Sequence, residues 1–313
     1  MNRPPRRLTG AAALAVSSSL ALAGCGSSKI GGTAGTAPNA SQSVNAQSAD
    51  PALAAMVPAA LRAKGTVVIA TDPTYAPNAF KDASGNIIGM DVDMGNAILA
   101  RLGLKPQWQG ADFGSIIGGL NAKKYDLSLA SFTDTKEREQ QLDMVGYFNA
   151  GEAIATLAGN PYQLTGNAGD LCGIRVAVQT NTVEATEIAE TINPACTKAG
   201  RPEIPNNGDQ FNAQTDAVSA LVAKRAQAMM ADSPVIDYVV QQSNGRLMKI
   251  GPDYNTAHYG IAIPKDDGRL ARAVQGALKG LINDGTYLQI LTKWGVQSGA
   301  LTADQVLINA ATS

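Results

Sequence analysis

Between residues 66 and 296, short runs of β-branched residues alternate with stretches whose apolar residues recur at helical spacing. Strands separated by helices in this way indicate an α/β fold. The elements expected in the first half are strands at 66–70 and 125–130, a helix at 91–101 that ends before Gly103, and a helix near Thr135. No tandem repeat or long low-complexity segment interrupts this pattern.

A second α/β series follows, and we expect it to start a new sheet. Its expected elements are strands at 174–180, 226–231 and 259–264, and helices at 182–192, 213–225, 269–283 and 286–293. Residues 51–313 exceed one typical domain, so they can support two cores of roughly 100–150 residues each.

The first 24 residues have the pattern of a secretory signal peptide. Arg3, Arg6 and Arg7 precede a small apolar run at 11–23, which is too short and too rich in alanine to span a membrane. The run ends in Leu-Ala-Gly-Cys, which resembles the lipobox of bacterial lipoproteins. That resemblance implies cleavage before Cys25, acylation of Cys25, and a mature protein anchored to the outer face of the cell membrane. The alternative is an ordinary thiol near an ordinary cleavage site.

Loss of residues 1–24 would remove three of the 25 basic residues and leave 22 against 26 acidic ones, a net charge of 22 − 26 = −4. No basic face is evident, so nucleic acid has no electrostatic reason to bind. Residues 26–50 are rich in Gly, Ser, Ala, Asn and Gln and poor in large apolar residues. We therefore expect 25–50 to be a lipidated cysteine followed by a flexible tether.

The two remaining cysteines, Cys172 and Cys196, are expected to pair in an oxidising compartment. Their bridge closes a loop of roughly 24 residues, worth about 3 kcal/mol in the chain-entropy model. The alternative is a metal site, but zinc needs clustered Cys or His ligands and His258 is the only histidine. We expect a disulfide, no metal and no cofactor.

Seven short motifs occur in a characteristic order along the body of the chain. They are TDPTYAP at 71–77, GMDVDM at 89–94, FGSII at 113–117, SFTDTKER at 131–138, RVAVQTNT at 175–182, MADSP at 230–234, and INDGTY through WG at 282–295. In this order they resemble the polar amino-acid-binding proteins of ABC importers, family 3 of the solute-binding proteins. The resemblance covers residues 64–297 and implies a two-lobed periplasmic-binding-protein fold of type II, with the ligand in the cleft.

The resemblance also implies how the chain divides between the lobes. Lobe I would combine residues 51–158 with residues 256–313, which include the C-terminal tail, and lobe II would contain residues 159–255. Two crossing strands would join the lobes.

A free amino acid presents a carboxylate and an ammonium, and a site that excludes water must pair both charges. Arg138 can bind the carboxylate with two parallel hydrogen bonds, and it lies in a first helical turn, where the macrodipole disfavours a cation. Asp232 follows the apolar run 228–231 at the end of a strand, where side chains face the crevice, so we expect it to accept from the ammonium. The alternatives are a solvated arginine and a turn aspartate that bonds its own backbone.

Four further polar contacts follow from the resemblance. Ser131 and Thr133 would offer hydroxyl and backbone groups in lobe I, while Thr182 and the amide of Val183 would open a helix toward the carboxylate in lobe II. As an alternative, each of these residues is a helix cap.

Tyr75 and Phe113 match positions that enclose the ligand side chain in the family, although isolated aromatic residues are more often core residues. The sequence departs from the family pattern at three positions. Ala130 replaces a serine and Val183 replaces a threonine, and each change removes a hydroxyl contact. Asn181 replaces a glycine, which is tolerable because asparagine adopts positive φ readily.

The acidic and amide residues near these motifs bear on the class of ligand. Asp72 matches an aspartate that contacts the distal cation of basic ligands in the family, Asp134 lies nearby on its motif, and Gln179 can donate or accept. Together they favour a cationic or neutral polar side chain over an anionic one. The alternative is that Asp72 braces the turn before Pro73.

We therefore expect a monomeric, lipid-anchored solute-binding protein that delivers a free polar L-amino acid to the permease subunits of an ABC importer. One alternative is a secreted arogenate or prephenate dehydratase, which resembles the same family and for which Asp72, Asp134 and Glu184 are candidate acids. With one histidine and no recognisable nucleophile motif, other enzyme classes are disfavoured. The other alternative is a ligand-sensing lipoprotein.

Overall fold

The computed structural model describes residues 47–265 and 268–312. The predicted signal peptide, Cys25 and the predicted tether up to residue 46 lie outside the described residues. Within the described ranges, no helix combines the length and the apolar character needed to cross a membrane.

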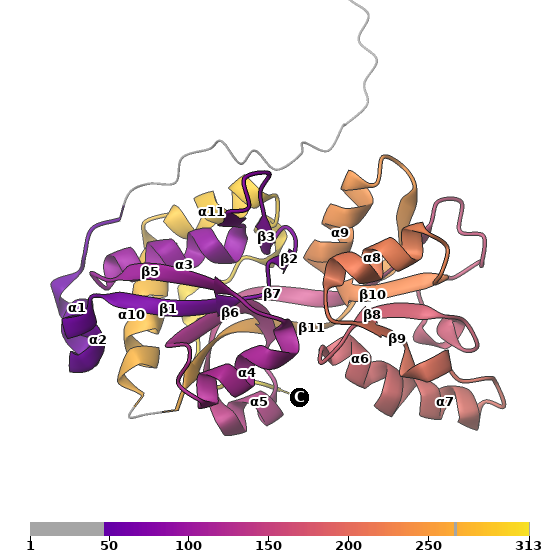
Figure 1. The fold of residues 1–313 in the computed structure, drawn as a ribbon, viewed down its shortest axis with the longest axis horizontal. Coiled ribbons are helices and arrows are strands. Elements are labelled where there is room, and N and C mark those ends of the chain that lie inside the picture. The colour runs from indigo at the N-terminus through magenta and orange to yellow at the C-terminus, as the bar shows by residue number, and fades with distance from the viewer. Residues whose placement is uncertain (1–46, 266–267, 313) are drawn as a thin grey trace, which may run out of the picture. The chain divides into compact units, whose positions relative to one another are not determined.

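One sheet of eight strands runs through both halves of the chain (Figure 1). Its strands are β1 (Thr66–Thr71), β5 (Lys105–Gly110), β6 (Leu127–Thr133), β7 (Leu142–Leu157), β8 (Val176–Gln179), β9 (Asp209–Phe211), β10 (Ala228–Asp232) and β11 (Leu247–Pro264). The spatial order is β5-β1-β6-β11-β7-β10-β8-β9. The two long strands β7 and β11 pair with each other, β11 also pairs with β6, and β7 also pairs with β10. The expectation of a separate second sheet is therefore wrong, because β7 and β11 make the ladder continuous.

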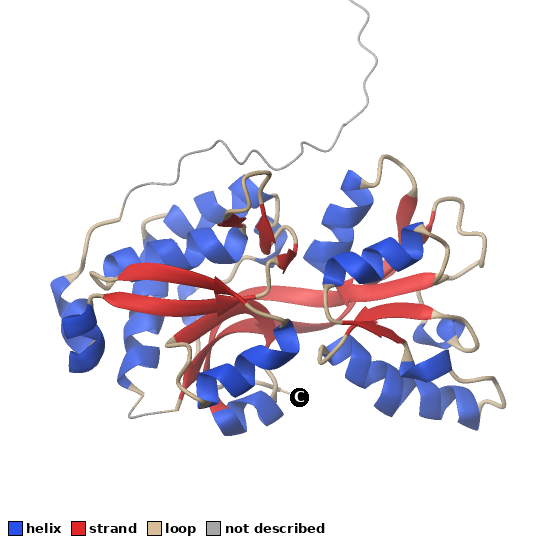
Figure 2. Cartoon of the chain, viewed as in Figure 1, coloured by secondary structure: helices blue, strands red, loops and turns tan. Residues whose placement is uncertain are grey.

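Helices cover both faces of the sheet in each lobe (Figure 2). Lobe I holds α1 (Pro51–Met56), α2 (Ala59–Lys64), α3 (Met90–Arg101), α4 (Phe113–Asn121), α5 (Lys136–Gln141), α10 (Arg269–Asn283) and α11 (Thr286–Trp294) around β1, β5 and β6. Lobe II holds α6 (Val183–Glu187), α7 (Asn193–Lys198), α8 (Gln214–Val222) and α9 (Ser233–Gln242) around β8, β9 and β10. The two-lobed fold predicted from the motifs is confirmed.

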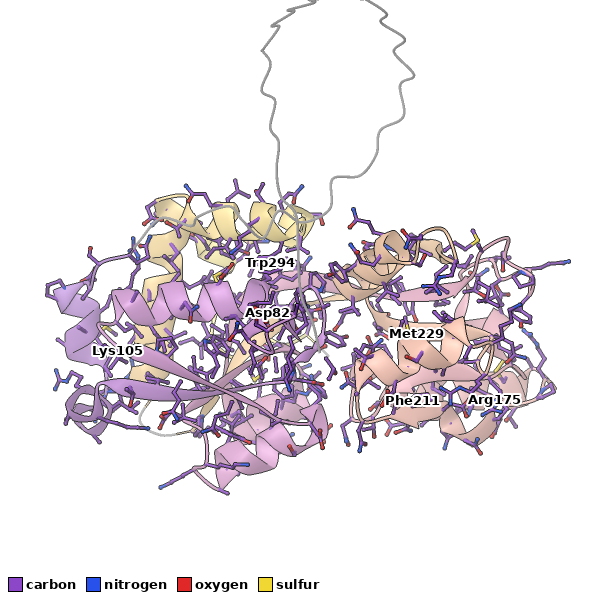
Figure 3. The ribbon with its side chains drawn as sticks, turned by 45° about the horizontal axis from the view of Figure 1, so that its top comes forward. Asp82, Lys105, Arg175, Phe211, Met229 and Trp294 are labelled. Carbon is purple, nitrogen blue, oxygen red and sulfur yellow. A yellow bond between two sulfur atoms is a disulfide. The ribbon has the colours of Figure 1, made fainter. Side chains whose placement is uncertain are left out.

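Each lobe has its own core on each face of the sheet. In lobe I, Met94, Leu278 and Ile290 bring α3, α10 and α11 into one cluster, while Ile116 of α4 belongs to a cluster on the other face. In lobe II, helices α8 and α9 pack on one face, and α6 with the helical turns that follow it packs on the other. Met229 of β10 lies inside lobe II, well separated from Trp294 in lobe I (Figure 3). The cavity between the lobes is lined by strand ends and by residues of α4, α5 and α6.

A small second sheet of lobe I borders the cleft. Its strands are β2 (Thr74–Tyr75), β3 (Ala79–Lys81) and β4 (Ile87–Ile88). Gly89 ends this sheet with a φ of 140°, and a Cβ there would lie 2.1 Å from the carbonyl oxygen of Asn78. Only glycine fits this close approach, and it allows α3 to begin at once at Met90.

Several element boundaries differ from those expected. Strand 259–264 is the end of the much longer β11, and the residue pattern predicted no strand at the positions of β5 and β7, although the family resemblance implied two crossing strands, the role of β7 and β11. The helix expected at 182–192 continues through a π-helical segment (Ile188–Ile192) into α7, which ends at Lys198. The helix at 269–283 has the expected ends, and that at 286–293 extends by one residue.

Cys172 and Cys196 form a disulfide in lobe II, with a Cα–Cα distance of 5.7 Å. The bridge joins the segment before β8 to α7, and both cysteines belong to the core of that face. The predicted pairing is thus present in the structure.

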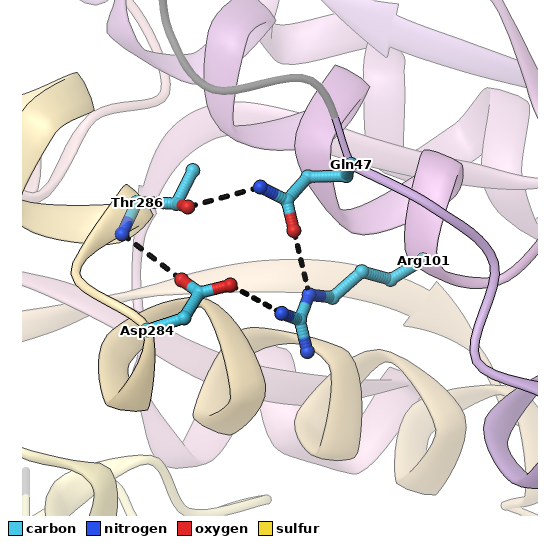
Figure 4. Close-up of polar contacts among 4 residues, drawn as sticks. All are labelled: Gln47, Arg101, Asp284 and Thr286. Atoms are coloured by element: carbon cyan, nitrogen blue, oxygen red, sulfur yellow. Dashed lines mark hydrogen bonds and ion pairs between the residues drawn. The ribbon is translucent and has the colours of Figure 1, made fainter.

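The last residues of the predicted tether contact lobe I (Figure 4). Gln47 Nε2 donates to Thr286 Oγ1 of α11 at 2.9 Å, and Arg101 Nε of α3 donates to Gln47 Oε1 at 2.9 Å. Arg101 also pairs with Asp284, whose carboxylate accepts from the backbone N–H of Thr286. The amide of Asp50 donates to the carbonyl of Arg101 at 2.8 Å. The expectation of a flexible segment therefore fails for residues 47–50.

Candidate ligand-binding site

A small cavity lies between the lobes. Its lining residues are Tyr75, Phe113, Ala130, Ser131, Thr133, Arg138, Gln179, Thr182, Val183, Glu184 and Asp232. This set contains every predicted ligand contact except Asp72, and it adds Ala130 and Glu184. The cavity has a volume of about 10 Å³, close to the space of one water molecule. A cavity of about 430 Å³ adjoins it and shares four of its lining residues.

Arg138 reaches the cavity from α5, a helix of six residues. The Thr135 side chain caps this helix by accepting from the Arg138 amide at 3.3 Å. The guanidinium donates to the carbonyl of Thr133 at 2.7 Å and to the carbonyl of Asn181, in lobe II, at 3.3 Å. Among the described residues, the hydrogen-bond partners of this cation are thus carbonyls, and its charge remains available to an anion.

Two aromatic rings form the floor beneath the guanidinium. The Arg138 Cζ atom lies 5.6 Å from the ring centroid of Phe113 and 5.1 Å from that of Phe132. The two rings are stacked on each other, with centroids 4.5 Å apart. Burial lowers the pKa of Arg138, and the nearby charges of Asp232 and Glu184 oppose that effect. The rings give the buried guanidinium cation–π contacts.

Asp232 supplies the opposite charge from the end of β10. It occupies the N-cap position of α9, but its carboxylate does not cap that helix. The carboxylate instead accepts a hydrogen bond of 2.7 Å from the hydroxyl of Tyr75, across the cleft in lobe I. Burial raises the pKa of Asp232 well above its usual range, and the nearby charge of Glu184 raises it further. Helix α9 begins directly after Asp232, with Ser233 as its first residue and Pro234 as its second.

Ser131 is held by residues that the sequence did not single out as part of the site. Its φ is 53°, an uncommon conformation for a residue with a side chain. Its Oγ accepts from Asn78 Nδ2 at 2.9 Å and donates to Asp91 Oδ2 at 3.0 Å, while Tyr147 donates to Asp91 Oδ1 at 2.6 Å. Burial raises the pKa of Asp91 to about 7. Asp91 thus holds the Ser131 side chain in its orientation. Its position inside the GMDVDM motif was the only sign in the sequence of this role.

Asp72 lies beside the cavity but does not line it. Its Oδ1 accepts from the backbone and hydroxyl of Thr74 at 3.1 and 2.8 Å, which is the turn-bracing arrangement considered from sequence. Its Oδ2 accepts from Gln179 Nε2 of lobe II at 2.5 Å, and the same amide donates to the carbonyl of Asn212 at 2.9 Å. Asp72 is therefore connected to the cavity by its hydrogen bond with Gln179, which lines it.

The first turn of α6 forms the lobe II side of the cavity. Thr182 caps this helix by accepting from the Ala185 amide at 3.3 Å, and its hydroxyl donates to the carbonyl of Gln179 at 2.9 Å. Asn181 has a φ of 62°, as its replacement of a glycine led us to expect. A Cβ on Gly114 of lobe I would lie 2.1 Å from the side-chain nitrogen (Nδ2) of Asn181, so the lobes approach closely here.

The other two acidic candidates, Asp134 and Glu184, differ in whether they line the cavity. Asp134 faces Glu139 and the backbone N–H of Ala310, away from the cavity lining, and its pKa is raised to about 7 by burial and by Glu139. Glu184 lines the cavity and is 1% exposed. Its Oε1 has no hydrogen-bond partner within the described part of the chain. Sequence reasoning considered Glu184 only as an acid of an enzyme, because a residue two positions past a helix cap carries no signal of where it points.

Residues 67–297 match the family described as bacterial extracellular solute-binding proteins, family 3. The chain belongs to this family. An arginine-binding protein of Corynebacterium glutamicum is 32% identical to this family 3 protein over 259 residues, which cover 83% of each chain. The family predicted from the motifs is confirmed, and its description supports a location outside the cytoplasm.

Two solved structures resemble this family 3 protein closely. An ancestral arginine-binding protein bound to arginine has a TM-score of 0.66 and 32% identity, over 74% of this chain and 98% of that one. An ancestral amino-acid-binding protein, described as a precursor of cyclohexadienyl dehydratase, has a TM-score of 0.67 and 29% identity, over 75% and 97%. These relatives are named as binding proteins rather than as enzymes.

Proposed function

We propose that this family 3 protein captures a polar L-amino acid with a cationic side chain and delivers it to the permease of an ABC importer. One observation carries the proposal. Two charged groups face one cavity from opposite lobes. One is the Arg138 guanidinium, whose hydrogen-bond partners in the described chain are carbonyls, and the other is the buried Asp232 carboxylate. Arg138 would bind the α-carboxylate with two parallel hydrogen bonds, and Asp232 would accept from the α-ammonium.

The remaining polar groups would complete the two ends of the ligand. The Ser131 hydroxyl and the Thr133 backbone lie on the Arg138 side, and the Val183 amide opens α6 toward the same carboxylate. Tyr75 and Phe113 would contact the apolar part of the side chain. Since one ligand would then bond both lobes, its binding would favour the closed arrangement.

The preference for a cationic side chain rests on the charges around the cavity. The lining contains one cation, Arg138, and two carboxyl groups, Asp232 and Glu184. A zwitterion pairs with Arg138 and Asp232 and leaves the Glu184 carboxyl group, whose Oε1 has no hydrogen-bond partner among the described residues, without a ligand contact. Asp72 would act indirectly, by holding Gln179 in place. The relatives named for arginine agree with this preference.

Calorimetric titration with all twenty amino acids tests the proposal, on purified protein from which co-purified ligand has been removed. We expect binding at about micromolar affinity, near −8 kcal/mol. Arginine, lysine, ornithine, histidine or glutamine should outcompete aspartate and glutamate. Saturation by sugars, peptides or metals alone would overturn the proposal, and tighter binding of glutamate than of any cationic or amide ligand would overturn the preference.

We propose no enzymatic activity. A dehydratase on this fold needs an acid beside its substrate, and Glu184 is the one candidate acid that lines the cavity. Incubation with arogenate and prephenate separates the two functions, since turnover of either would establish the enzyme. A sensing lipoprotein would share every site residue, and pull-down of a permease rather than a signalling partner distinguishes transport from sensing.

We further propose that Cys25 carries the lipid anchor on the outer face of the cell membrane and that the protein is a monomer. The anchor rests on the Leu-Ala-Gly-Cys sequence after the apolar run.

A further inference from the structure

Three glutamates gather where α6 meets the crossing strands, and we call them the acidic recess: Glu152, Glu184 and Glu187. Glu152 belongs to β7 and pairs in register with Asp232 of β10. The side-chain amide of Asn255 donates to Glu152 at 3.1 Å and to Glu187 at 3.2 Å, so one donor is shared by two carboxyl groups. The recess therefore begins at the cavity, through Glu184, and extends behind it.

The recess holds more acceptors than donors. Glu184 is 1% exposed and Glu152 is 6% exposed. Glu184 Oε1 and Glu152 Oε2 have no hydrogen-bond partner in the part of the chain that the structure describes. An ionised carboxylate in this setting is costly, so buried carboxyl groups retain protons instead. Burial raises the pKa of both residues, and for Glu152 the nearby charges of Glu184 and Glu187 add to the effect.

The groups that face the recess from other elements include one cation, Arg138, whose charge opposes the rise in the pKa of Glu184. They are Arg138 of α5, Asp232 at the end of β10, Tyr75 of β2, and Tyr254 and Tyr259 of β11. Tyr254 donates to Glu187 at 3.3 Å, and Tyr75 donates to Asp232. Arg138 is the cation of this set, and the proposed function assigns it to the ligand's carboxylate. The unpartnered oxygen of Glu184, buried at the cavity wall, therefore lacks a positive charge.

We propose that the distal cation of the ligand's side chain binds Glu184 and displaces the proton that Glu184 holds, so that capture of a cationic amino acid releases this proton to solvent. This inference rests on the proposed function and adds to it the exchange of a bound proton for the ligand's cation. The carboxylic O–H bond breaks, the proton passes to water, and the carboxylate left behind pairs with the cation. Charge is conserved in the recess, because one positive charge enters as another leaves.

The exchange makes affinity depend on both ligand charge and pH. Binding that releases one proton strengthens about tenfold for each unit by which pH rises, as long as the empty recess stays protonated. A neutral ligand of the same shape, such as citrulline, brings no cation to Glu184 and leaves this proton in place. Uptake would therefore favour cationic ligands more strongly at neutral than at acidic pH.

The test is calorimetric titration of the purified protein with L-arginine at pH 7 in two buffers that differ in ionisation enthalpy. The dependence of the binding enthalpy on that of the buffer counts the protons released. We expect Glu184→Gln to release about one proton fewer than the wild type and to bind arginine at least tenfold more weakly. Glu190→Gln, at an exposed position on the next helical segment, is the matched control and should behave as the wild type does.

Citrulline, measured by displacement of arginine, should lose less than threefold in affinity in Glu184→Gln. Equal proton numbers in the wild type and Glu184→Gln would overturn the exchange while leaving amino-acid capture intact. Failure of the wild type to bind any amino acid would overturn both. Should Glu184→Gln not fold, the affinity of the wild type for arginine between pH 6 and 8 decides: a rise with pH supports the exchange, and a flat profile overturns it.

Discussion

Arg138 and Asp232 show how two side chains acquire a role from what surrounds them. The guanidinium lies on stacked rings with carbonyls as its hydrogen-bond partners in the described chain, and the carboxylate is buried against a tyrosine hydroxyl from the other lobe. In water these groups would be ordinary surface charges. Inside the cleft, each lacks a full counter-charge, and a zwitterion provides both.

Replacing either charge should weaken binding strongly. We expect Arg138→Lys and Asp232→Asn each to cost about 2 kcal/mol or more, because a ligand charge is then poorly matched in a closed cleft. Calorimetry with the best ligand measures the loss, and the exposed Arg62→Lys serves as the control. Full affinity in either variant would remove that residue from the proposed site.

Asp91 should make the stability of the protein depend on pH. Its pKa is about 7 in the folded protein against 3.8 for the free group, so the folded state holds a proton that the unfolded state loses between these values. Its contribution is therefore present below pH 4 and lost as pH rises through 7, a change of about 4 kcal/mol at most. We expect the free energy of unfolding to fall less from pH 4 to pH 8 in Asp91→Asn than in the wild type.

Denaturant unfolding at several pH values measures this difference. The exposed Asp216→Asn variant should retain the wild-type profile. An identical pH profile in Asp91→Asn would mean that Asp91 is ionised throughout.

At the scale of elements, the sequence predicted helices and strands best where the hydrophobic periodicity was regular. The helix at 269–283 has its expected ends because its apolar stripe is continuous, with Leu270, Val274 and Leu281 all buried. β7 was missed because it is buried on both faces and interrupted by Gly146 and Gly151, so it shows no alternation. β5 is a largely exposed edge strand that contains Pro106, and neither feature indicates a strand.

Site residues were likewise predicted where a sequence pattern marked them. Residues inside motifs, such as Arg138 and Asp232, were predicted because the resemblance carried them together. Glu184 and Glu152 were not assigned to the site, because the influence of one on the other depends on how α6 packs against the sheet, and no sequence spacing encodes that packing. The lobe boundaries at residues 158 and 255, like the roles of the site residues, stay predictions.

The disulfide should stabilise lobe II. Removing it with Cys172→Ser and Cys196→Ser together should lower the free energy of unfolding by about 3 kcal/mol, from a loop of 24 residues. Chemical denaturation measures the change, and the double variant avoids a stray thiol. Peptide mapping without reductant checks the bond itself, and two free thiols in the native protein would contradict it.

For the whole molecule, the N-terminal cysteine should decide where the protein resides. In bacterial cells, we expect the wild type to partition into detergent with the membrane lipoproteins and Cys25→Ala to be released in aqueous form, because acylation supplies the anchor. The Cys172→Ser and Cys196→Ser double variant should partition as the wild type does. Detergent partitioning of Cys25→Ala would rule out the lipid at this position.

The hydrogen bonds that Tyr75 makes with Asp232, and Asp72 with Gln179, join the two lobes directly beside the cavity. No solute can reach a space of about 10 Å³ until these bonds break and the lobes separate. The speed of capture is then governed by how often the protein opens rather than by how often it meets a solute. In rapid mixing, the observed rate should level off at the opening rate of the cleft as solute concentration increases, instead of rising in proportion to concentration as a diffusion-limited encounter would.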